Sequence, residues 1–271
     1  MNHPQLSVQP NAERAYELHR PQFLSQLLAP MDDMWAAFAD LGAPFSLFVG
    51  EVLAGSCSVD GEGQLLRFFV LPQFSNESLA LLELTAAECG VTHMMVSTAD
   101  PSYLCPALDL AADVESHTLL FAQVATIRAE PIERLVLAEL ADLERVIEFQ
   151  VEATGMPADF LQVYTRTRIE LRELWLVRTK SQIIGVGELR IDQQQAGIAH
   201  LGVIVGAPDR RKGMGAAILC SLVEQCRELG VVPYCSTEGT NIGARRAIER
   251  AGFYAQHRLL RIEPRLSKAA Q

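Results

Sequence analysis

The chain of 271 residues lacks any apolar run of the roughly 18 to 20 residues that a membrane-spanning helix needs. Its start, Met1 to Gln5, lacks the basic stretch and the apolar core of a secretory leader, so export is not expected. Its six cysteines include no C-x-x-C pair, so neither a zinc site nor a redox dithiol is supported and no metal is expected. Reduced thiols fit a cytoplasmic protein, which is the predicted location.

Basic residues are scarce in the first half of the chain. Residues 1–128 contain four basic and 15 acidic side chains, whereas residues 129–271 contain 19 basic and 18 acidic ones. The net charge of −10 argues against non-specific binding of nucleic acid. The acidity of the first half has two interpretations that the sequence leaves open. It forms either a solvated surface that aids solubility or a wall that attracts a cationic substrate.

What the chain does contain is a basic segment with two glycines. Arg210-Arg211-Lys212-Gly213-Met214-Gly215 lies between the apolar run Leu201–Val205 and a helical pattern that begins near Ala216. A strand that enters such a turn and then a helix directs several backbone N–H groups, and the positive end of the helix dipole, at one point. Glycine lets the backbone approach an anion closely, and no carboxylate occurs between Asp209 and Glu224. The segment is therefore predicted to hold a pyrophosphate.

Strand and helix patterns surround this segment in the second half of the chain. The helix after the loop is predicted to end at Gly230. Its apolar face is predicted to consist of Ile218, Leu219, Leu222, Val223, Cys226 and Leu229. Further helices are predicted over 143–149, 159–166 and 241–251. Strands are predicted over 134–140, 174–177, 183–191, 198–205 and 234–236 and as a final pair within 253–262, with a turn over 179–182.

The first half repeats this rhythm with one difference. Strands are predicted over 45–49, 52–59, 65–71 and 94–98, and a helix over 79–89. The interval from Gly55 to Gly90 is 35 residues, whereas the matching interval from Gly185 to Gly230 is 45. The missing residues fall at 72–78, which contain neither glycine nor a basic side chain. The first half is therefore predicted to keep the scaffold without the anion site, although two αβ halves can also look alike by chance.

Two motifs in this order resemble the GNAT superfamily of N-acetyltransferases. Arg210, Gly213 and Gly215 match its Arg/Gln-x-x-Gly-x-Gly/Ala loop, which follows the fourth strand. The segment from Asn241 to Phe253 is similar to its Asn-x-x-Ala/Ser … Gly-Phe segment. The resemblance covers about 134–262, and the first half resembles the fold as a degenerate copy.

The resemblance implies an α/β fold of two GNAT-like domains, residues 1–128 and 129–271, each a mixed and mostly antiparallel sheet flanked by helices. In the second domain the sheet would splay between its fourth and fifth strands and bind acetyl-CoA there as a co-substrate. Backbone groups of the fourth strand would pair with the pantetheine, and amides of the loop would hold the pyrophosphate. The residues implied in this binding are Val203, Ile204, Val205, Arg210, Arg211, Lys212, Gly213, Met214, Gly215, Ala216 and Asn241.

One position departs from the superfamily. Ile248 stands where many members carry a tyrosine that protonates the leaving thiolate. A thiolate with a pKa of about 8.5 to 9 needs little help at neutral pH, so transfer of an acetyl group to a primary amine by direct attack is still expected. A backbone N–H, that of Val205 or a neighbour, would polarise the carbonyl group. The alternatives are a non-catalytic acyl-CoA-binding or interaction protein, and a transferase for a hydroxyl or a larger acyl group.

Three residues are candidates for the catalytic base, and each also has a structural interpretation. His200 precedes the loop on its strand, and histidine has an unperturbed pKa of about 6.5. Glu188 interrupts an apolar strand, and Glu238 follows the strand that would line the cleft. The sequence favours Glu238 slightly without separating the three. The expected partner is a small-molecule or peptide amine, contacted within 156–164, with a homodimer left open and neither nucleic acid nor membrane expected.

Overall fold

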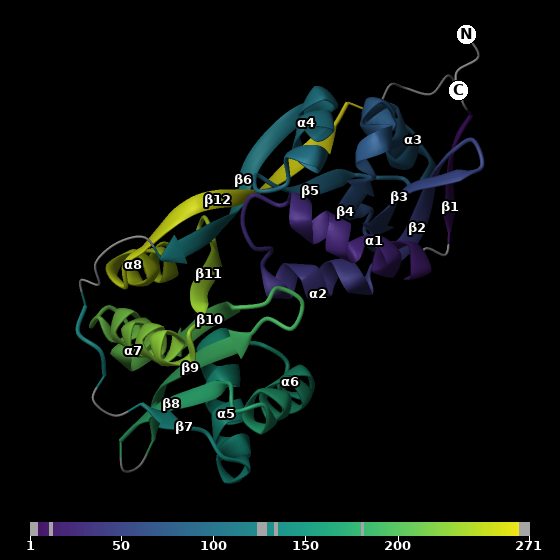
Figure 1. Ribbon diagram of the computed structural model, residues 1–271. Coiled ribbons are helices and arrows are strands. Elements are labelled where there is room, and N and C mark those ends of the chain that lie inside the picture. The colour runs from purple at the N-terminus through teal and green to yellow at the C-terminus, as the bar shows by residue number, and fades with distance from the viewer. Residues whose placement is uncertain (1–4, 11–12, 124–128, 133–134, 180–181, 266–271) are drawn as a thin grey trace. The chain divides into compact units, whose positions relative to one another are not determined.

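The chain folds into two compact units, whose elements are labelled in Figure 1. The first unit takes in the described residues of Met1–Leu119 and His257–Gln271, and the second takes in those of Leu120–Gln256. The domains expected from the sequence, 1–128 and 129–271, stay a prediction. The computed structural model describes residues 5–10, 13–123, 129–132, 135–179 and 182–265.

The first unit is a mixed sheet with helices on both faces. Its strands follow the order β1-β2-β3-β4-β5-β12, and only β4 and β5 pair in parallel. The strands are β1 Leu6–Pro10, β2 Ala43–Val49, β3 Val52–Val59, β4 Gln64–Val70 and β5 His93–Ser97, with β6 Ala111–Gln123 and β12 Phe253–Pro264 contributing residues to both units. The helices are α1 Glu13–Gln26, α2 Asp33–Leu41, η1 Pro72–Glu77, α3 Ser78–Glu88 and α4 Pro101–Asp109.

The core of the first unit has two sides because successive residues of a strand point to opposite faces of the sheet. Phe68 of β4 packs with Leu81 and Leu82 of α3 on one face, whereas its neighbour Phe69 packs with Phe23 of α1 on the other. All five side chains are at most 2% exposed. The alternation in β4 therefore secures α1 and α3 on opposite faces.

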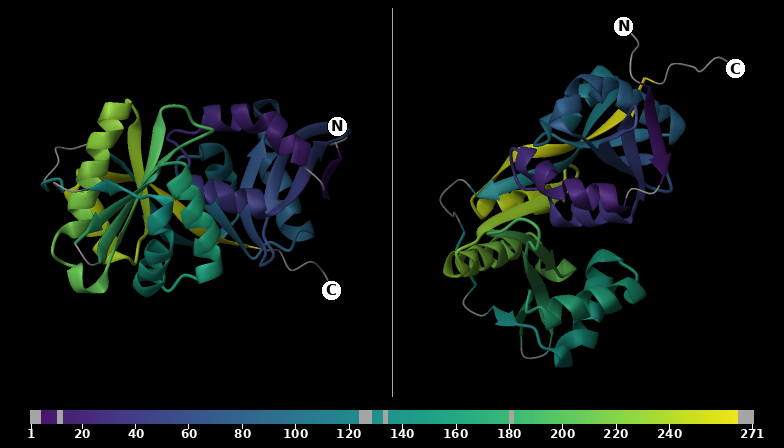
Figure 2. Two further views of the ribbon diagram at one scale, coloured as in Figure 1. Left: turned by 90° about the horizontal axis from the view of Figure 1, so that it is seen from below. Right: turned by 45° about the vertical axis from the view of Figure 1, so that its right-hand side comes forward.

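The second unit is also a mixed sheet between helices. Figures 1 and 2 show α7 on one face of its strands and α5 and α6 on the other. In the order β11-β10-β9-β8-β7, only β10 and β11 pair in parallel. The strands are β7 Val136–Leu137, β8 Leu174–Arg178, β9 Ile183–Ile191, β10 Ile198–Val205 and β11 Val232–Glu238. The helices are η2 Leu140–Asp142, α5 Leu143–Thr154, α6 Ala158–Glu170, η3 Ala207–Asp209, α7 Met214–Leu229 and α8 Ile242–Arg250.

Two glycines of β9 set the position of α7 against the sheet. A Cβ atom added at Gly185 or at Gly187 would lie 2.8 or 2.7 Å from side-chain carbons of Ile218 in α7. Ile218 is fully buried at this contact. The absence of side chains at these positions lets the helix pack closely on the sheet, which brings its first turn to the end of β10. The mixed, mostly antiparallel sheet flanked by helices that the sequence predicts for each half is confirmed.

Some expectations about single elements are wrong. The predicted pair of strands within 253–262 is one continuous strand, β12, because this stretch contains no glycine, proline or short polar turn residue before Pro264. Leu229, predicted on the buried face of its helix, is 60% exposed because it is the last residue of α7. The first strand predicted for the second half corresponds to β7.

A few expectations fall outside the described residues. They concern Arg134, with which the strand over 134–140 was to begin, and Lys180 and Ser181 of the turn over 179–182. Within the described part of the chain, no helix is both long and apolar enough to span a membrane.

Candidate active site

Strands β10 and β11 separate partway along their length. Their parallel register runs from Ile198↔Val232 to His200↔Tyr234 and ends there. Beyond that point β10 continues to Val205, with its other edge paired to β9 as far as Val205↔Gly185, and β11 continues to Glu238. The sheet therefore opens between its fourth and fifth strands, as the family resemblance implies. The opening leaves one edge of the last part of β10 without β11 as a strand partner.

The loop after β10 leads into a helix whose first N–H groups have no side-chain cap. Gly213 is the N-cap residue of α7 and has a φ of 87°, in the left-handed region that glycine adopts without strain. The first intrahelical bond runs from the Ala217 N–H to the Gly213 carbonyl over 3.1 Å. The N–H groups of Met214, Gly215 and Ala216 precede it and, like those at the start of any helix, need an external acceptor. An anion is the acceptor that this helix terminus suits.

The three cationic side chains of the loop have different surroundings. Arg210 donates from Nε to the Val205 carbonyl over 2.9 Å and from Nη2 to the Ala153 carbonyl, in the last turn of α5, over 2.6 Å. Lys212 Nζ lies 3.1 Å from Oδ1 of Asp209. Arg211 is exposed and makes no side-chain hydrogen bond or ion pair with the residues that the structure describes. Arg210 therefore secures the loop, and Arg211 is the one of the three whose side chain has no partner among the described residues.

The other motif residues have structural contacts. A Cβ atom at Gly215 would lie 3.3 Å from that of Ala247, so this glycine permits close packing of α7 on α8. Asn241 is the N-cap of α8, where its Oδ1 accepts a hydrogen bond from the Ala244 N–H over 3.1 Å. Ile248, at the position of the family tyrosine, is 4% exposed. The expected contacts of Gly215 and Asn241 with acetyl-CoA stay predictions.

Glu188 belongs to a buried polar cluster on the face of the sheet that α5 and α6 cover. Its Oε2 accepts a hydrogen bond from the Tyr164 hydroxyl over 2.7 Å and from Nη1 of Arg190 over 2.5 Å. Gly202 is its register partner on β10, and a Cβ there would lie 3.3 Å from Nη1 of Arg190. Oε1 has no hydrogen-bond partner among the described residues. Glu188 thus lies opposite Gly202, two residues past the point where β11 departs, with its bonded Oε2 as the carboxylate oxygen nearest to that glycine.

His200 is held by a carboxylate. Its Nε2 donates to Oδ2 of Asp192 over 2.9 Å, and both side chains are at most 5% exposed. Burial alone would raise the pKa of Asp192, but hydrogen bonds from His200 and from two backbone N–H groups outweigh it and lower this pKa to about 2. Glu238, by contrast, is exposed at the end of β11 and has no side-chain partner among the described residues. The three candidate bases therefore occupy three different environments.

Two residues of the Glu188 cluster were missed from the sequence. Glu188 and Arg190 lie two residues apart on one strand, and this spacing places both side chains on the same face of the sheet. The sequence alone could therefore have predicted that the two side chains are neighbours. Tyr164 lies within 156–164, the segment where the sequence expects acceptor contacts. Its bond to Glu188 depends on how α6 packs on the sheet, and no local pattern reveals that.

The first unit has a similar opening without the anion-binding loop. The parallel register of β4 and β5 ends at Leu65↔Met94, although both strands continue beyond it. The segment that follows β4 is η1, and Glu77 is the N-cap of α3. A carboxylate at that position opposes a bound phosphate. The lack of an anion site in the first half stays a prediction.

Two family models match the chain. One, described as "Acetyltransferase (GNAT) domain", matches residues 13–124, and the other, described as "Acetyltransferase (GNAT) family", matches residues 137–253. No curated protein matches the chain.

Several solved structures are similar along nearly the whole chain. An acetyltransferase from the GNAT family from Colwellia psychrerythraea is 28% identical with a TM-score of 0.90, over 96% of this chain and 100% of that one. A GCN5-related N-acetyltransferase from Sphaerobacter thermophilus is 18% identical with a TM-score of 0.66, over 97% of each chain. A tandem GNAT protein from the clavulanic acid biosynthesis pathway is 13% identical with a TM-score of 0.64, over 98% of this chain and 100% of that one. The last two likenesses concern the fold alone.

Proposed function

The chain belongs to the GNAT acetyltransferase superfamily, with two GNAT domains, and we propose that it transfers an acetyl group from acetyl-CoA to a primary amine by direct attack. The observation that carries the proposal is the opening of β10 from β11 beyond His200, next to the uncapped first turn of α7. The open edge of β10 lies at one end of the segment that joins β10 to α7, and the uncapped N–H groups of α7 lie at the other end. Acetyl-CoA is an elongated thioester whose pantetheine can pair with a strand edge and whose pyrophosphate can accept hydrogen bonds from such N–H groups.

The residues present fit acetyl-CoA. The backbone of Val203 and Ile204 would pair with its pantetheine, whereas the carbonyl of Val205 is already bonded to Arg210. N–H groups from Arg211 to Ala216 would hold its pyrophosphate, and the side chain of Arg211 would add one positive charge. The nearest carboxylate in sequence, that of Asp209, is paired with Lys212. The co-substrate supplies the acetyl thioester.

Of the three candidate bases, the geometry supports Glu188 best. Glu188 lies opposite Gly202 on the strand that would carry the pantetheine, and its Oε1 has no hydrogen-bond partner among the described residues. Nε2 of His200 is already bonded to Asp192, and Glu238 is solvated. In the proposed reaction one ammonium proton first passes to Glu188, directly or through water. The neutral amine nitrogen then forms a bond to the acetyl carbon, the carbon–sulfur bond breaks, and the second proton of the nitrogen leaves to solvent as the amide forms. The thiolate leaves without a general acid because Ile248 replaces the family tyrosine.

The test is the release of coenzyme A from acetyl-CoA in the presence of a panel of primary amines, followed with a thiol reagent. An enzyme should show slow release with acetyl-CoA alone and faster release with at least one amine. Calorimetry run beside it measures acetyl-CoA binding. Binding without turnover by any amine would favour the alternative, a non-catalytic acyl-CoA-binding protein, and no binding at all would contradict both.

Three single variants then identify the base: Glu188→Gln, His200→Gln and Glu238→Gln. The variant that lowers kcat about a hundredfold, with acetyl-CoA affinity retained, marks the proton acceptor. A normal kcat for Glu188→Gln would transfer the role to one of the other two.

The cytoplasmic location that we propose is supported by the six cysteines, all of which are free thiols.

A further inference from the structure

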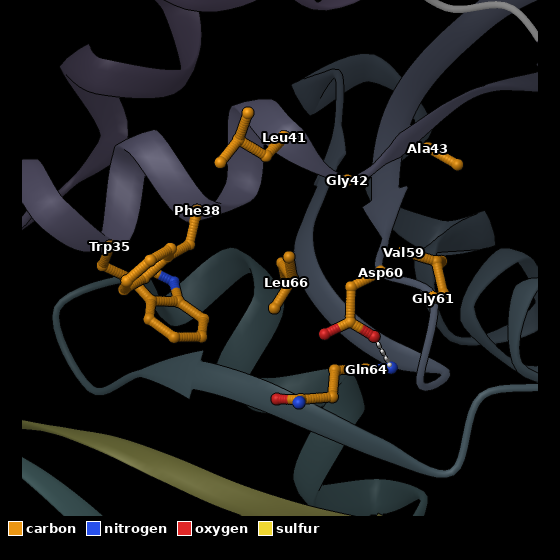
Figure 3. Close-up of a pocket in the computed structure, with 10 residues that line it drawn as sticks. All are labelled: Trp35, Phe38, Leu41, Gly42, Ala43, Val59, Asp60, Gly61, Gln64 and Leu66. Carbon is orange, nitrogen blue, oxygen red and sulfur yellow. Dashed lines mark hydrogen bonds between the residues drawn. The ribbon is translucent and has the colours of Figure 1, made fainter. Parts of the chain in front are cut away.

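A second candidate site lies in the first unit, in a pocket of about 430 Å³ between α2 and the turn that joins β3 to β4. Figure 3 shows its lining, with Trp35 and Phe38 on one side, Asp60 and Gln64 on the other, and Leu66 between them. A volume of this size is typical of pockets that take small organic molecules. The pocket lies at the start of β4, whereas the opening between β4 and β5 lies beyond Leu65.

The walls of the pocket are firmly anchored. The Ser58 hydroxyl of β3 donates to the Ala39 carbonyl of α2 over 2.6 Å. A Cβ atom at Gly42, which ends α2, would lie 2.4 Å from the Ser58 hydroxyl oxygen, so only glycine allows the helix end to approach β3 this closely. Ala39 is buried with Leu66 and Met95, and Trp35 packs against them. The pocket is therefore preformed by packing.

One wall is aromatic. The rings of Trp35 and Phe38 meet edge to face, with their centroids 6.2 Å apart and their planes at 73°. Phe38 is nonetheless 50% exposed, and Leu41 beside it is 84% exposed. Aromatic faces offer both apolar contact and attraction for a cation.

The opposite wall ends in a fixed carboxylate. Oδ1 of Asp60 accepts hydrogen bonds from the N–H groups of Glu62 and Gln64 over 2.9 and 2.8 Å. Figure 3 shows this bond to Gln64 and the second carboxylate oxygen on the side of Leu66. Neither that oxygen nor the side-chain amide of Gln64 has a partner among the described residues. Both groups are thus free to contact a molecule in the pocket.

The charge of the lining selects the kind of molecule. None of the residues that line the pocket is basic, and Asp60 is the charged group among them. The surrounding first half of the chain is strongly acidic. We propose that this pocket binds a small organic ammonium ion, with its apolar group against Trp35 and Phe38 and its charge at Asp60. The acidity of the first half then attracts this molecule as well as solvating the surface.

Fluorescence of Trp35 tests the proposal directly. The chain contains two tryptophans, so Trp175→Phe in the second unit leaves Trp35 as the reporter. Phenethylammonium chloride should change this fluorescence saturably at neutral pH. 2-Phenylethanol and 3-phenylpropionate have the same ring with no charge and with a negative charge, and each should bind at least about tenfold more weakly. Equal binding of the three molecules, or no saturable change, would overturn the proposal.

Single substitutions test which side chains of the pocket bind the ammonium ion. Asp60→Asn keeps the acceptor that fixes the turn and should weaken binding of phenethylammonium about tenfold. Glu62→Gln removes the same charge two residues away, outside the lining, and should have no effect. Phe38→Leu changes a half-exposed residue and should weaken binding several-fold through loss of the aromatic face. Unchanged affinity of Asp60→Asn would also overturn the proposal.

A negative result for the pocket can be distinguished from a negative result for the proposed acyl transfer, on which the pocket does not depend. Binding of phenethylammonium is measured without acetyl-CoA, and Glu188→Gln in the second unit should leave it unchanged. Loss of the fluorescence response in Glu188→Gln would instead place the amine at the proposed acceptor site and contradict the pocket.

Discussion

The hydroxyl of Tyr164 donates a hydrogen bond to Oε2 of Glu188 over 2.7 Å, and so joins α6 to β9 across 24 residues of sequence. Burial, and after it the charge of Glu188, raises the pKa of Tyr164 above its ordinary value. The phenol therefore keeps its proton at neutral pH and remains a donor. With Arg190 as the second donor to the same oxygen, the carboxylate is held in one orientation with Oε1 free.

Tyr164→Phe should reduce kcat about three- to tenfold with little change in the affinity for acetyl-CoA. The reason is that Glu188 loses one of the two donors that orient it, whereas the loop before α7 is untouched. Steady-state kinetics with a responsive amine check this. Tyr254→Phe removes a hydroxyl that is exposed on β12 and should leave kcat unchanged. A fall in acetyl-CoA affinity without a fall in kcat would contradict the orienting role.

Gly213→Asp should abolish acetyl-CoA binding, because a carboxylate would face the pyrophosphate. A Cβ atom at this position meets no other atom within 4 Å, so steric conflict does not explain a loss. Gly213→Asn is the matched control, since asparagine has the same shape, tolerates the left-handed region and carries no charge. Calorimetry should give much weaker binding for the aspartate variant than for the asparagine variant. Equal affinities would argue against the loop as the pyrophosphate site.

Arg210 and Arg211 should differ in what they support. Arg210→Ala removes two hydrogen bonds to backbone carbonyls and should lower the free energy of unfolding by about 1 kcal/mol, with weaker acetyl-CoA binding as a consequence. Arg211→Gln should leave the melting temperature unchanged and still weaken acetyl-CoA binding, since the side chain has no other partner among the described residues. Thermal unfolding and calorimetry on both variants separate the two roles. The reverse pattern would exchange them.

The low pKa of Asp192, whose carboxylate is hydrogen-bonded to His200, predicts that the protein loses stability at acid pH. The pKa of Asp192 falls from 3.8 to about 2 on folding, so this carboxylate stabilises the fold above pH 4 and its contribution is lost as the pH falls toward 2. For a side chain that is 5% exposed, the shift corresponds to roughly 2 kcal/mol at neutral pH. Asp192→Asn should remove this stabilisation and flatten the acid limb of a pH series of urea unfolding curves.

Asp159→Asn supplies the control for that series, because Asp159 is exposed on α6. It removes the same formal charge without touching a buried pair. An acid limb that is as steep in Asp192→Asn as in the parent protein would show that other groups control acid unfolding.

Elements with a clear period or a glycine stop could be predicted from the sequence. β3 and β10 have the bounds that the alternation indicates, and α7 ends at Gly230. The helices α1, α2 and α4 were not predicted. α1 and α4 contain Pro21 and Pro106, which weaken a helical pattern, and α2 has Asp32 as a cap that sequence reasoning overlooked.

The site was predictable to the extent that it depends on the backbone. Gly213 needs a positive φ, and that requirement is visible in one residue type. The partners of Arg210, His200 and Glu188 lie on other elements and become visible only when the sheet and helices have packed. For this reason the sequence could propose the loop and could not choose the base.

Residues 257–265 belong with the amino-terminal unit, and β12 pairs there with β5 from Leu259↔Ser97 to Ile262↔Met94. The two GNAT copies are therefore interleaved along the chain and not simply consecutive. Proteolytic cleavage near residue 128 would leave β12 covalently joined to the carboxyl-terminal fragment, although this strand pairs with β5 of the amino-terminal fragment. Expressing either half alone would require a permuted gene that returns the last strand to the copy it completes.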